Sequence, residues 1–265
     1  DVHYSFPGLK VHFKSALMIR KERGTTKLYA YMSTGNFHEG TAKVYSDLGL
    51  FTTDRRITLE VSRLFSYLET VKMTNQQYKH LLVGHFGLLE NLIAMIDREI
   101  EHAKAGKKAK IVLKMNSLQD EEMVEKLYEA SNAGVKIDLI IRGICSLVPG
   151  KKGWSENINC ISIVDRFLEH ARIFVFHNDG AENVYLSSAD WMGRNLRRRI
   201  ETAFPIYDEK VKAEVLEMLR IQLSDNVKAR IIDEADENEY KQNDMDLSIR
   251  SQVELYYHYK RQEEQ

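Results

Sequence analysis

Two stretches of this sequence share one layout and decide the fold: residues 2–14 read VHYSFPGLKVHFK, and residues 160–172 read CISIVDRFLEHAR. They align without a gap. In both copies a predicted strand and a short turn lead to a histidine that stands two residues before a cation. The histidines are His12 and His170, and each is expected to start a second strand.

Small residues follow both histidines after about one more strand and turn. Residues 33–36 read STGN and residues 187–190 read SSAD, and each string is expected at the end of a strand. Asn36 and Asp190 therefore occupy matching places, where they are either polar site residues or turn residues. The shared order predicts two units built on one plan.

Strands and helices alternate along the rest of the chain. Apolar runs predict strands at residues 2–6, 13–20, 28–33, 110–115, 136–142, 160–164, 172–177 and 183–188. Helical spacing predicts helices at residues 57–70, 84–105, 119–134, 192–197, 209–224 and 247–264. Asp54 and Asp120 are expected to start two of these helices. The predicted fold class is α/β, with mixed β-sheets flanked by helices in two sandwich units.

The apolar periodicity lapses at residues 72–77, which places a domain boundary near residue 75. We expect residues 1–75 to be the second half of the first unit and residues 76–265 to be the second unit. A full helix–strand–helix–strand run precedes the second histidine, whereas the first histidine has no such run before it. The first unit is therefore expected to be truncated at its N-terminus.

A charged helical tail ends the second unit. Residues 233–239 carry too much charge to be buried. The helix after them is expected to pack through Leu255, Tyr256 and Tyr259, and no chemistry is assigned to it.

Composition argues against several classes of protein. The chain has 265 residues, and 38 basic against 39 acidic side chains leave a net charge of −1. This balance argues against a nucleic-acid partner or a dedicated membrane surface. We find neither an apolar run of about 18 residues, which a transmembrane segment would need, nor the glycine-rich string of a P-loop nucleotide site. Cys145 and Cys160 lack disulfide or metal-ligand spacing, so we expect a cytoplasmic protein, with peripheral attachment to a membrane as the alternative.

A histidine and a cation two residues apart form the chemical centre of each unit. Residues two apart on a strand point to the same face, so His12 would meet a ligand together with Lys14, and His170 together with Arg172. Neutral imidazole is a competent nucleophile near neutral pH. The cation offsets charge on the oxygens of a transferring phosphoryl group. Two facing units would supply one nucleophile and one proton donor.

This duplicated pattern resembles the paired histidine–lysine motifs of the phospholipase D superfamily. The aspartate that follows the lysine in that superfamily has no counterpart after Lys14, where Ile19 and Arg20 stand. Five longer strings resemble the catalytic domains of the polyphosphate kinase family over residues 8–206. They are GLKVHFK, STGNFHEGTAKVYSDLGLFTTD, KMNSLQDEEMVEKLYEASNAGVKIDLIIRGICSLVPG, RFLEHARIFVF and VYLSSADWMGRNLRRRIETAFPI.

The resemblance implies a reaction and roles for four residues. His12 would be phosphorylated by ATP and would pass the phosphate to inorganic polyphosphate. Tyr45, Arg142 and His170 would contact the nucleotide, and His170 would also assist proton transfer. ATP, ADP, polyphosphate and Mg²⁺ are the implied ligands, and self-association into a homo-oligomer is implied for the complete protein. The magnesium-linked arginines of the family lie upstream of the matched region, so no metal ligand is assigned in this chain.

Several further cations could contact phosphates, although a solvated face is the usual meaning of a basic run. Lys14, Arg142 and Arg172 are the strongest candidates, because strand ends in open α/β sheets are where ligands bind. Arg166 and Arg194 are weaker candidates. The three arginines at residues 197–199 are either a solvated face or a path for polyphosphate. Glu169, beside the second histidine, is expected to face solvent.

Two other functions stay open at this point. A phosphodiesterase of the phospholipase D kind would use the same two histidines to hydrolyse a phosphodiester. A non-catalytic module would bind a polyanion in the same cleft without turnover. The absent aspartate and the long kinase-like strings favour the polyphosphate kinase.

Overall fold

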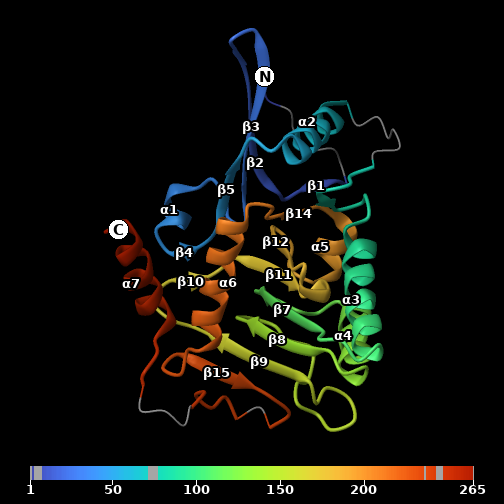
Figure 1. The fold of residues 1–265 in the computed structure, drawn as a ribbon, viewed down its shortest axis with the longest axis vertical. Coiled ribbons are helices and arrows are strands. Elements are labelled where there is room, and N and C mark those ends of the chain that lie inside the picture. Colours follow the sequence, from blue (N-terminus) through green and yellow to red (C-terminus); the bar gives the residue numbers. More distant parts are fainter. Residues whose placement is uncertain (1, 3–7, 71–76, 236, 243–246, 265) are drawn as a thin grey trace.

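The computed structural model describes residue 2 and residues 8–70, 77–235, 237–242 and 247–264. A mixed sheet forms the centre of the molecule (Figure 1). Its strands are β6 (Leu82–Val83), β7 (Lys110–Met115), β8 (Lys136–Ile141), β9 (Ile158–Ile163), β11 (Arg172–Phe176), β12 (Asn183–Ser187), β14 (Thr202–Pro205) and β15 (Ala229–Ile232). They lie in the order β15-β9-β8-β7-β11-β12-β14-β6. β7, β8 and β9 run parallel, and the other neighbours pair antiparallel.

Helices cover both faces of this sheet. α3 (Leu88–Lys104) and α4 (Glu121–Asn132) pack on one face, and α6 (Glu209–Leu223) packs on the other. Side chains alternate along a strand, so Leu113 of β7 joins the core with α3 and α4, whereas Val112 joins the core with α6. Burial of both faces explains why the central strands are short, nearly continuous apolar runs.

A smaller antiparallel sheet carries the first unit. It is formed by β2 (Lys14–Glu22), β3 (Thr25–Ser33) and β5 (Gly49–Thr52), in the order β2-β3-β5. The β2–β3 hairpin projects beyond the body of the molecule, at the top of Figure 1. α2 (Arg55–Thr70) packs against this sheet, and its buried apolar side chains share a core with Ala30 and Met32 of β3.

Two short parallel ladders join the first unit to the second. β1 (Lys10–Val11) pairs with β13 (Arg199–Ile200), and β4 (Tyr45–Ser46) pairs with β10 (Leu168–Glu169). Each ladder contains one strand from each unit. β1 and β10 lead directly into the two histidines, so these ladders set where the candidate catalytic side chains lie.

The predicted repeat is present in the structure. β2 and β3 form a hairpin after the first histidine, and β11 and β12 pair antiparallel in the same way after the second. A helix follows in each unit behind an aspartate. The Asp54 carboxylate accepts from Arg56 N at 2.8 Å, and the Asp208 carboxylate accepts from Lys210 N at 2.9 Å.

The sequence predicts the longer elements and misses the short ones. The α/β class and the expected helix start at Asp120, which caps α4, are confirmed. The strands that the sequence does not predict are β1, β4, β5, β6, β10, β13, β14 and β15. α3 begins at Leu88 instead of residue 84, because the residues before it have positive φ, 66° at His85 and 97° at Gly87. The strand expected at residues 2–6 lies almost wholly outside the described residues, and the boundary near residue 75 lies outside them too.

The remaining helices are short or terminal. They are α1 (Glu39–Ala42), α5 (Gly193–Arg198), the 3-10 turn η1 (Asn178–Gly180) and α7 (Ser251–Glu263). The tail helix α7 begins later than expected. Of its predicted packing residues only Leu255 contacts the core, whereas Tyr256 is 61% exposed and Tyr259 is 39% exposed. Within the described ranges, no helix combines the length and the apolar character needed to cross a membrane.

Candidate active site

His12 lies in the turn between β1 and β2, just before the strand rather than on it. Its ring Nδ1 is 2.8 and 2.9 Å from the two carboxylate oxygens of Glu201. Its ring Nε2 is 3.1 Å from the ammonium of Lys14, the first residue of β2. Nδ1–H therefore donates to the carboxylate, and Nε2 keeps the lone pair that a nucleophile needs.

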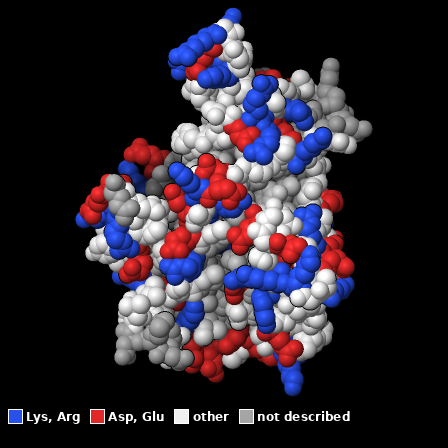
Figure 2. Space-filling model, in the orientation of Figure 1, with Lys and Arg blue, Asp and Glu red and all other residues white. Residues whose placement is uncertain are grey.

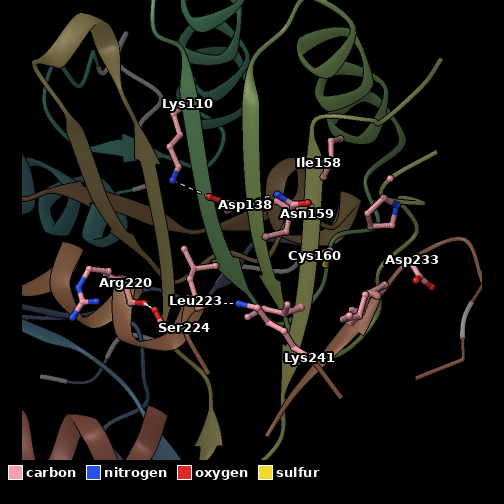
Figure 3. A pocket seen from close by; sticks show the side chains of 16 residues that line it. Lys110, Asp138, Ile158, Asn159, Cys160, Arg220, Leu223, Ser224, Asp233 and Lys241 are labelled. Carbon is pink, nitrogen blue, oxygen red and sulfur yellow. Dashed lines mark hydrogen bonds and ion pairs between the residues drawn. The ribbon is translucent and has the colours of Figure 1, made fainter. Parts of the chain in front are cut away.

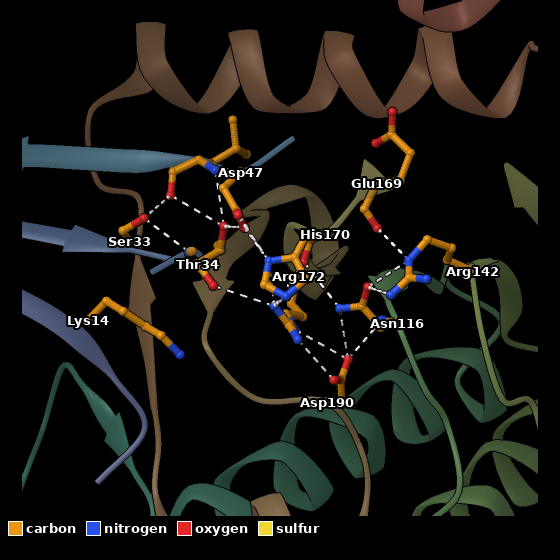
Figure 4. Close-up of polar contacts among 12 residues, drawn as sticks. Lys14, Ser33, Thr34, Asp47, Asn116, Arg142, Glu169, His170, Arg172 and Asp190 are labelled. Atoms are coloured by element: carbon orange, nitrogen blue, oxygen red, sulfur yellow. Dashed lines mark hydrogen bonds and ion pairs between the residues drawn. The ribbon is translucent and has the colours of Figure 1, made fainter. Parts of the chain in front are cut away.

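His170 repeats this arrangement just before β11. Its ring Nδ1 is 2.8 and 2.9 Å from the two carboxylate oxygens of Asp47. Its ring Nε2 is 3.1 Å from Nη1 of Arg172. Figure 4 shows this arrangement at His170. Each of the two imidazoles thus has one nitrogen fixed by a carboxylate and the other nitrogen beside a cation.

The two carboxylates cross between the units. Asp47 belongs to the first unit but holds the histidine of the second, and Glu201 does the reverse. Each carboxylate also accepts from a hydroxyl of its own unit: Thr34 donates to Asp47 at 2.7 Å, and Ser188 donates to Glu201. These hydroxyls belong to the matching small-residue strings, which explains why both strings are buried at that position.

Asp47 and Glu201 are site residues that were not predicted from the sequence. The signal was available in the repeat, because the two residues stand equally far after Asn36 and Asp190. A glycine is required at position 35 for a steric reason. A Cβ at this position would lie 2.1 Å from the Asp47 carboxylate. The small residues therefore make room for a carboxylate of the site.

The pKa of Lys14 depends on charged groups around both histidines. Burial lowers its pKa to about 8 from 10.5; among the charges acting on it, Glu201 and Asp47 raise the pKa and Arg172 and Arg199 lower it. These groups come from both units. Figure 4 shows the Lys14 ammonium directed toward the group formed by His170 and Arg172. The histidines thus belong to one site between the units.

Arg172 is held by Asp190 beneath the site. The Asp190 carboxylate lies 3.0 Å from Nη2 of Arg172 and accepts from the backbone of Asn116 at 2.8 Å and of Ser117 at 3.2 Å. Burial raises the pKa of Asp190, but the Arg172 guanidinium and these N–H groups outweigh burial and leave the pKa below its usual value. Asp190 is therefore a carboxylate that orients Arg172.

Arg142 reaches the same place from the end of β8. Its Nη2 donates to the Asn116 side-chain oxygen at 2.7 Å, and its Nε donates to the Glu169 carbonyl at 3.2 Å. The Asn116 amide donates in turn to the His170 carbonyl at 3.2 Å. Arg142 and His170 are thereby linked through one backbone segment.

Tyr45 lies beside His170, with ring centroids 4.8 Å apart and planes inclined by 58°. It is half-buried on β4, in register with Leu168 of β10. The matching position of the other ladder is Arg199 of β13, in register with Lys10. The repeat thus places an aromatic ring beside one histidine and a guanidinium near the other.

Other sequence-predicted residues lie at the surface. Asn36, Arg166 and Arg194 are exposed, and the Arg166 guanidinium stacks over its neighbour Phe167 at 5.6 Å. Among the three arginines of residues 197–199, Arg197 pairs with Asp120 and Glu122 at 3.0 and 2.8 Å. Arg199 is the member of this run that lies within electrostatic reach of Lys14.

The expectation that Glu169 faces solvent is wrong. Its side chain is 3% exposed and forms an ion pair of 2.5 Å with Lys114, which is equally buried. The strand β10 turns this side chain inward, because His170, the next residue, points into the site.

A cavity of about 550 Å³ lies between β8, β9, β15 and the end of α6, and Figure 3 shows the side chains that line it. It lacks every residue of the histidine site. Its cations are engaged already: Lys110 pairs with Asp138 at 2.9 Å, Arg220 pairs with Glu217 at 2.6 Å, and Lys241 contacts the Leu223 carbonyl. Each of these three cations therefore already has a partner within the protein.

Charge on the molecular surface is mixed. On the face shown in Figure 2, Lys and Arg side chains are interspersed with Asp and Glu. A polyanion would meet no broad basic field on this face. Positive charge at the histidines comes instead from Lys14, Arg142 and Arg172.

Together the fold and the site define an α/β protein with a duplicated histidine–cation–carboxylate centre suited to phosphoryl chemistry. The family model described as "Polyphosphate kinase C-terminal domain 2" matches residues 81–252, and "Polyphosphate kinase C-terminal domain 1" matches residues 1–74. The chain belongs to the family of polyphosphate kinase C-terminal domains.

Relatives agree with this assignment. The polyphosphate kinase of Vibrio vulnificus is 48% identical over 96% of this chain and 36% of its own length. The crystal structure of polyphosphate kinase from Porphyromonas gingivalis superposes with a TM-score of 0.93 at 46% identity, over 99% of this chain and 40% of that one. The phosphatidylserine synthase of Haemophilus influenzae shares the fold alone, with a TM-score of 0.53 at 10% identity over 89% of this chain and 68% of that one. The chain spans little more than a third of the length of the curated relatives it matches.

Proposed function

We propose that this chain carries the phosphoryl-transfer site of a polyphosphate kinase, which moves the terminal phosphate of ATP reversibly onto inorganic polyphosphate. One observation supports this most strongly. Each histidine has its Nδ1 held by a carboxylate from the opposite unit and its Nε2 beside a cation. With this pairing, one imidazole can attack phosphorus as a nucleophile, and the other can donate or accept a proton as a general acid or base.

His12 is the proposed nucleophile. Its Nε2 lone pair forms a bond to the γ-phosphorus, while the bond from that phosphorus to the bridging oxygen breaks and ADP leaves with the electron pair. The Glu201 carboxylate stabilises the positive charge that develops on the ring. Lys14, which contacts Nε2 at 3.1 Å, then offsets charge on the transferring oxygens.

His170 is the proposed acid and base at the nucleotide. Tyr45 would stack on the adenine beside it, and Arg142 and Arg172 would contact the phosphates. In the second step the terminal oxygen of polyphosphate attacks the phosphohistidine and restores neutral His12. The reverse reaction, ATP from ADP, uses the same groups.

Mg²⁺ would arrive with the nucleotide in this proposal. Among the described residues, no group of three or more His, Cys, Asp and Glu side chains could hold a metal ion. The carboxylates of the site are engaged with His12, His170 and Arg172. The side chains that the structure describes at this site therefore do not form a resident magnesium site.

The organisation of the complete protein is also proposed. Residues 1–75 would be part of the first catalytic domain and residues 76–265 the second, which the ranges of the two family models support. Cys145 and Cys160 are free thiols, and this favours a reducing, cytoplasmic location. Self-association would be a property of the complete protein.

Labelling tests the reaction. The complete natural protein is incubated with γ-labelled ATP, and the label is tested for acid lability and mapped by peptide. We expect acid-labile label on the peptide that contains His12 and none after His12→Ala. His38→Ala is the matched control, because His38 is exposed and its ring bonds Thr41 at the start of α1.

Other outcomes would redirect the assignment. Label that persists in His12→Ala would rule out this histidine as the nucleophile. Histidine-dependent hydrolysis of a phosphodiester without labelling would favour the phosphodiesterase. Retention of polyphosphate with neither activity would favour a polyanion-binding module.

A further inference from the structure

The tail helix α7 packs against the segment that leads into His170. This segment comprises residues 165–169 and ends in β10, which pairs with Tyr45 and Ser46 of β4. The side chain of Gln252 pairs with its backbone as a neighbouring strand would. The Gln252 side-chain oxygen accepts from Phe167 N at 3.0 Å, and its amide donates to Phe167 O at 2.8 Å.

Gln252 also contacts the buried Glu169 carboxylate of β10. Its amide donates to one Glu169 carboxylate oxygen at 2.8 Å. The other oxygen of this carboxylate accepts from Lys114 at 2.5 Å and from Gln222 at 2.9 Å. Burying a carboxylate is costly unless several donors form hydrogen bonds with it. Gln252 is the donor that comes from the tail.

The start of α7 is fixed by further polar contacts. Arg250 forms two hydrogen bonds with Asp165, at 2.5 and 2.8 Å. Ser251 N donates to the buried Asp225 carboxylate at 2.7 Å, and Ile249 N donates to the Asn226 side chain at 2.6 Å. These contacts hold Gln252 against the segment before His170.

The first unit is built differently at this place. The residue that matches Glu169 in the repeat is Val11, which cannot hold such a network. Within the described part of the chain, the elements that follow α2 are β6 and α3, and α3 packs in the core of the second unit. The tail therefore acts on one histidine of the pair.

We propose that Gln252 is a positioning residue for His170. It fixes β10 from outside while Lys114 and Gln222 hold Glu169 from inside, so that the imidazole and Tyr45 keep their places at the nucleotide. The chemical consequence rests on the proposed function, whereas the effect on β10 does not.

Two measurements on the complete natural protein test this role, with Gln252→Ala as the variant. Gln262→Ala is the matched control, since Gln262 is exposed on the same helix and its side chain bonds only His258 among the described residues. The first measurement is hydrogen exchange of the backbone amides of Leu168, His170 and Ala171, which donate to the carbonyls of Val44 and Ser46. We expect about tenfold faster exchange in Gln252→Ala, and no change in the control.

The second measurement compares two phosphate donors for His12. ATP needs the nucleotide side of the site, whereas phosphoramidate is a small donor that bypasses it. We expect Gln252→Ala to slow labelling by ATP about fivefold to tenfold and to leave labelling by phosphoramidate unchanged.

Each result has one meaning. Faster exchange together with a selective loss of ATP labelling supports the positioning role. Unchanged exchange overturns it, and so does an equal loss with both donors, because that would be a general effect on folding. If the wild-type protein takes no label from ATP, the proposed function fails, and the exchange rates still decide whether Gln252 positions β10.

Discussion

At the scale of single residues, the site depends on the carboxylates that cross between the units. Glu201 fixes Nδ1 of His12, and Asp47 fixes Nδ1 of His170. An amide in either place could donate as well as accept, so the imidazole would lose its fixed tautomer. We expect Glu201→Gln and Asp47→Asn each to slow ATP-dependent labelling of His12 by about a hundredfold in single-turnover experiments.

Asp54→Asn is the matched control for Asp47→Asn. Asp54 lies in the same unit, but its carboxylate caps α2 and pairs with Arg56. Its replacement should leave the labelling rate near that of the wild type. A wild-type rate in Asp47→Asn would mean that His170 works without this carboxylate.

Lys14 predicts the pH dependence of the reaction. Its pKa is lowered to about 8 by burial, so the ammonium is present below pH 8 and is lost as the pH rises through this value. Phosphoryl transfer should therefore fall above about pH 8, because the transferring oxygens lose a neighbouring positive charge. Lys14→Arg keeps its charge throughout this range, so its rate profile should stay flat there. Equal falling limbs in both proteins would assign the titration to another group.

The burial of Lys14 also makes the free energy of unfolding depend on pH, with a sign opposite to that of the phosphoryl-transfer rate. With the native pKa below the unfolded value, the unfolded chain binds more protons than the native chain between about pH 8 and 10.5. The contribution of Lys14 to the free energy of unfolding therefore becomes more favourable as the pH rises through this window. Activity and this contribution to stability should move in opposite directions.

The sequence identifies some residues of the site and hides others. His12, His170 and their neighbouring cations were predictable, because they stand in the repeated pattern and their side chains are of types that take part in phosphoryl transfer. Asp47, Glu201 and Asn116 are ordinary polar residues of loops and strand ends, and only the distances across the two units give them a role. Glu169 looks exposed because a lone charge beside a histidine usually is, and its partners Lys114 and Gln222 are distant in sequence.

At the scale of elements, the two parallel ladders divide the site into unlike halves. β4 brings Tyr45 to His170, and β13 brings Arg199 into the field of Lys14. An aromatic ring can stack on the adenine of a nucleotide, and a guanidinium can form charge-assisted hydrogen bonds with phosphate. We expect Tyr45→Ala to raise the KM for ATP about tenfold and Arg199→Ala to raise the KM for polyphosphate instead.

Steady-state kinetics with each substrate varied in turn separates these effects. Tyr45→Phe should behave like the wild type, because the ring is retained, and Arg198→Ala is an exposed neighbour of Arg199 that should change neither KM. If Arg199→Ala raised the KM for ATP alone, the division of the site between the two ladders would be wrong.

The ladders themselves could not be predicted from sequence. β1, β4, β10 and β13 have two residues each, which is too short for any periodicity. Their pairing also joins segments far apart in the chain. The longer strands and helices were predictable, because an apolar face of five or more residues leaves a pattern.

At the scale of the whole molecule, the Lys114–Glu169 pair joins elements that the sequence places far apart. Lys114 belongs to β7 and Glu169 to β10, and both are 3% exposed at the side chain. Gln222 of α6 and Gln252 of α7 complete the network. Removing one partner leaves an uncompensated buried charge, which typically costs about 3–5 kcal/mol. We expect Glu169→Ala to lower the free energy of opening of the central sheet by about this amount, as measured by native-state hydrogen exchange of the β7 amides.

A double replacement separates the effect of the buried charges from the effect of lost side-chain volume. Lys114→Met combined with Glu169→Leu removes both charges at similar volume, so it should recover most of the lost free energy. Lys104→Ala is the control, because its pair with Glu101 is exposed, at 58% and 72%, and surface pairs contribute little. A double variant as unstable as Glu169→Ala would mean that hydrogen bonding by Gln222 and Gln252, rather than the buried charge, holds β10 to the sheet.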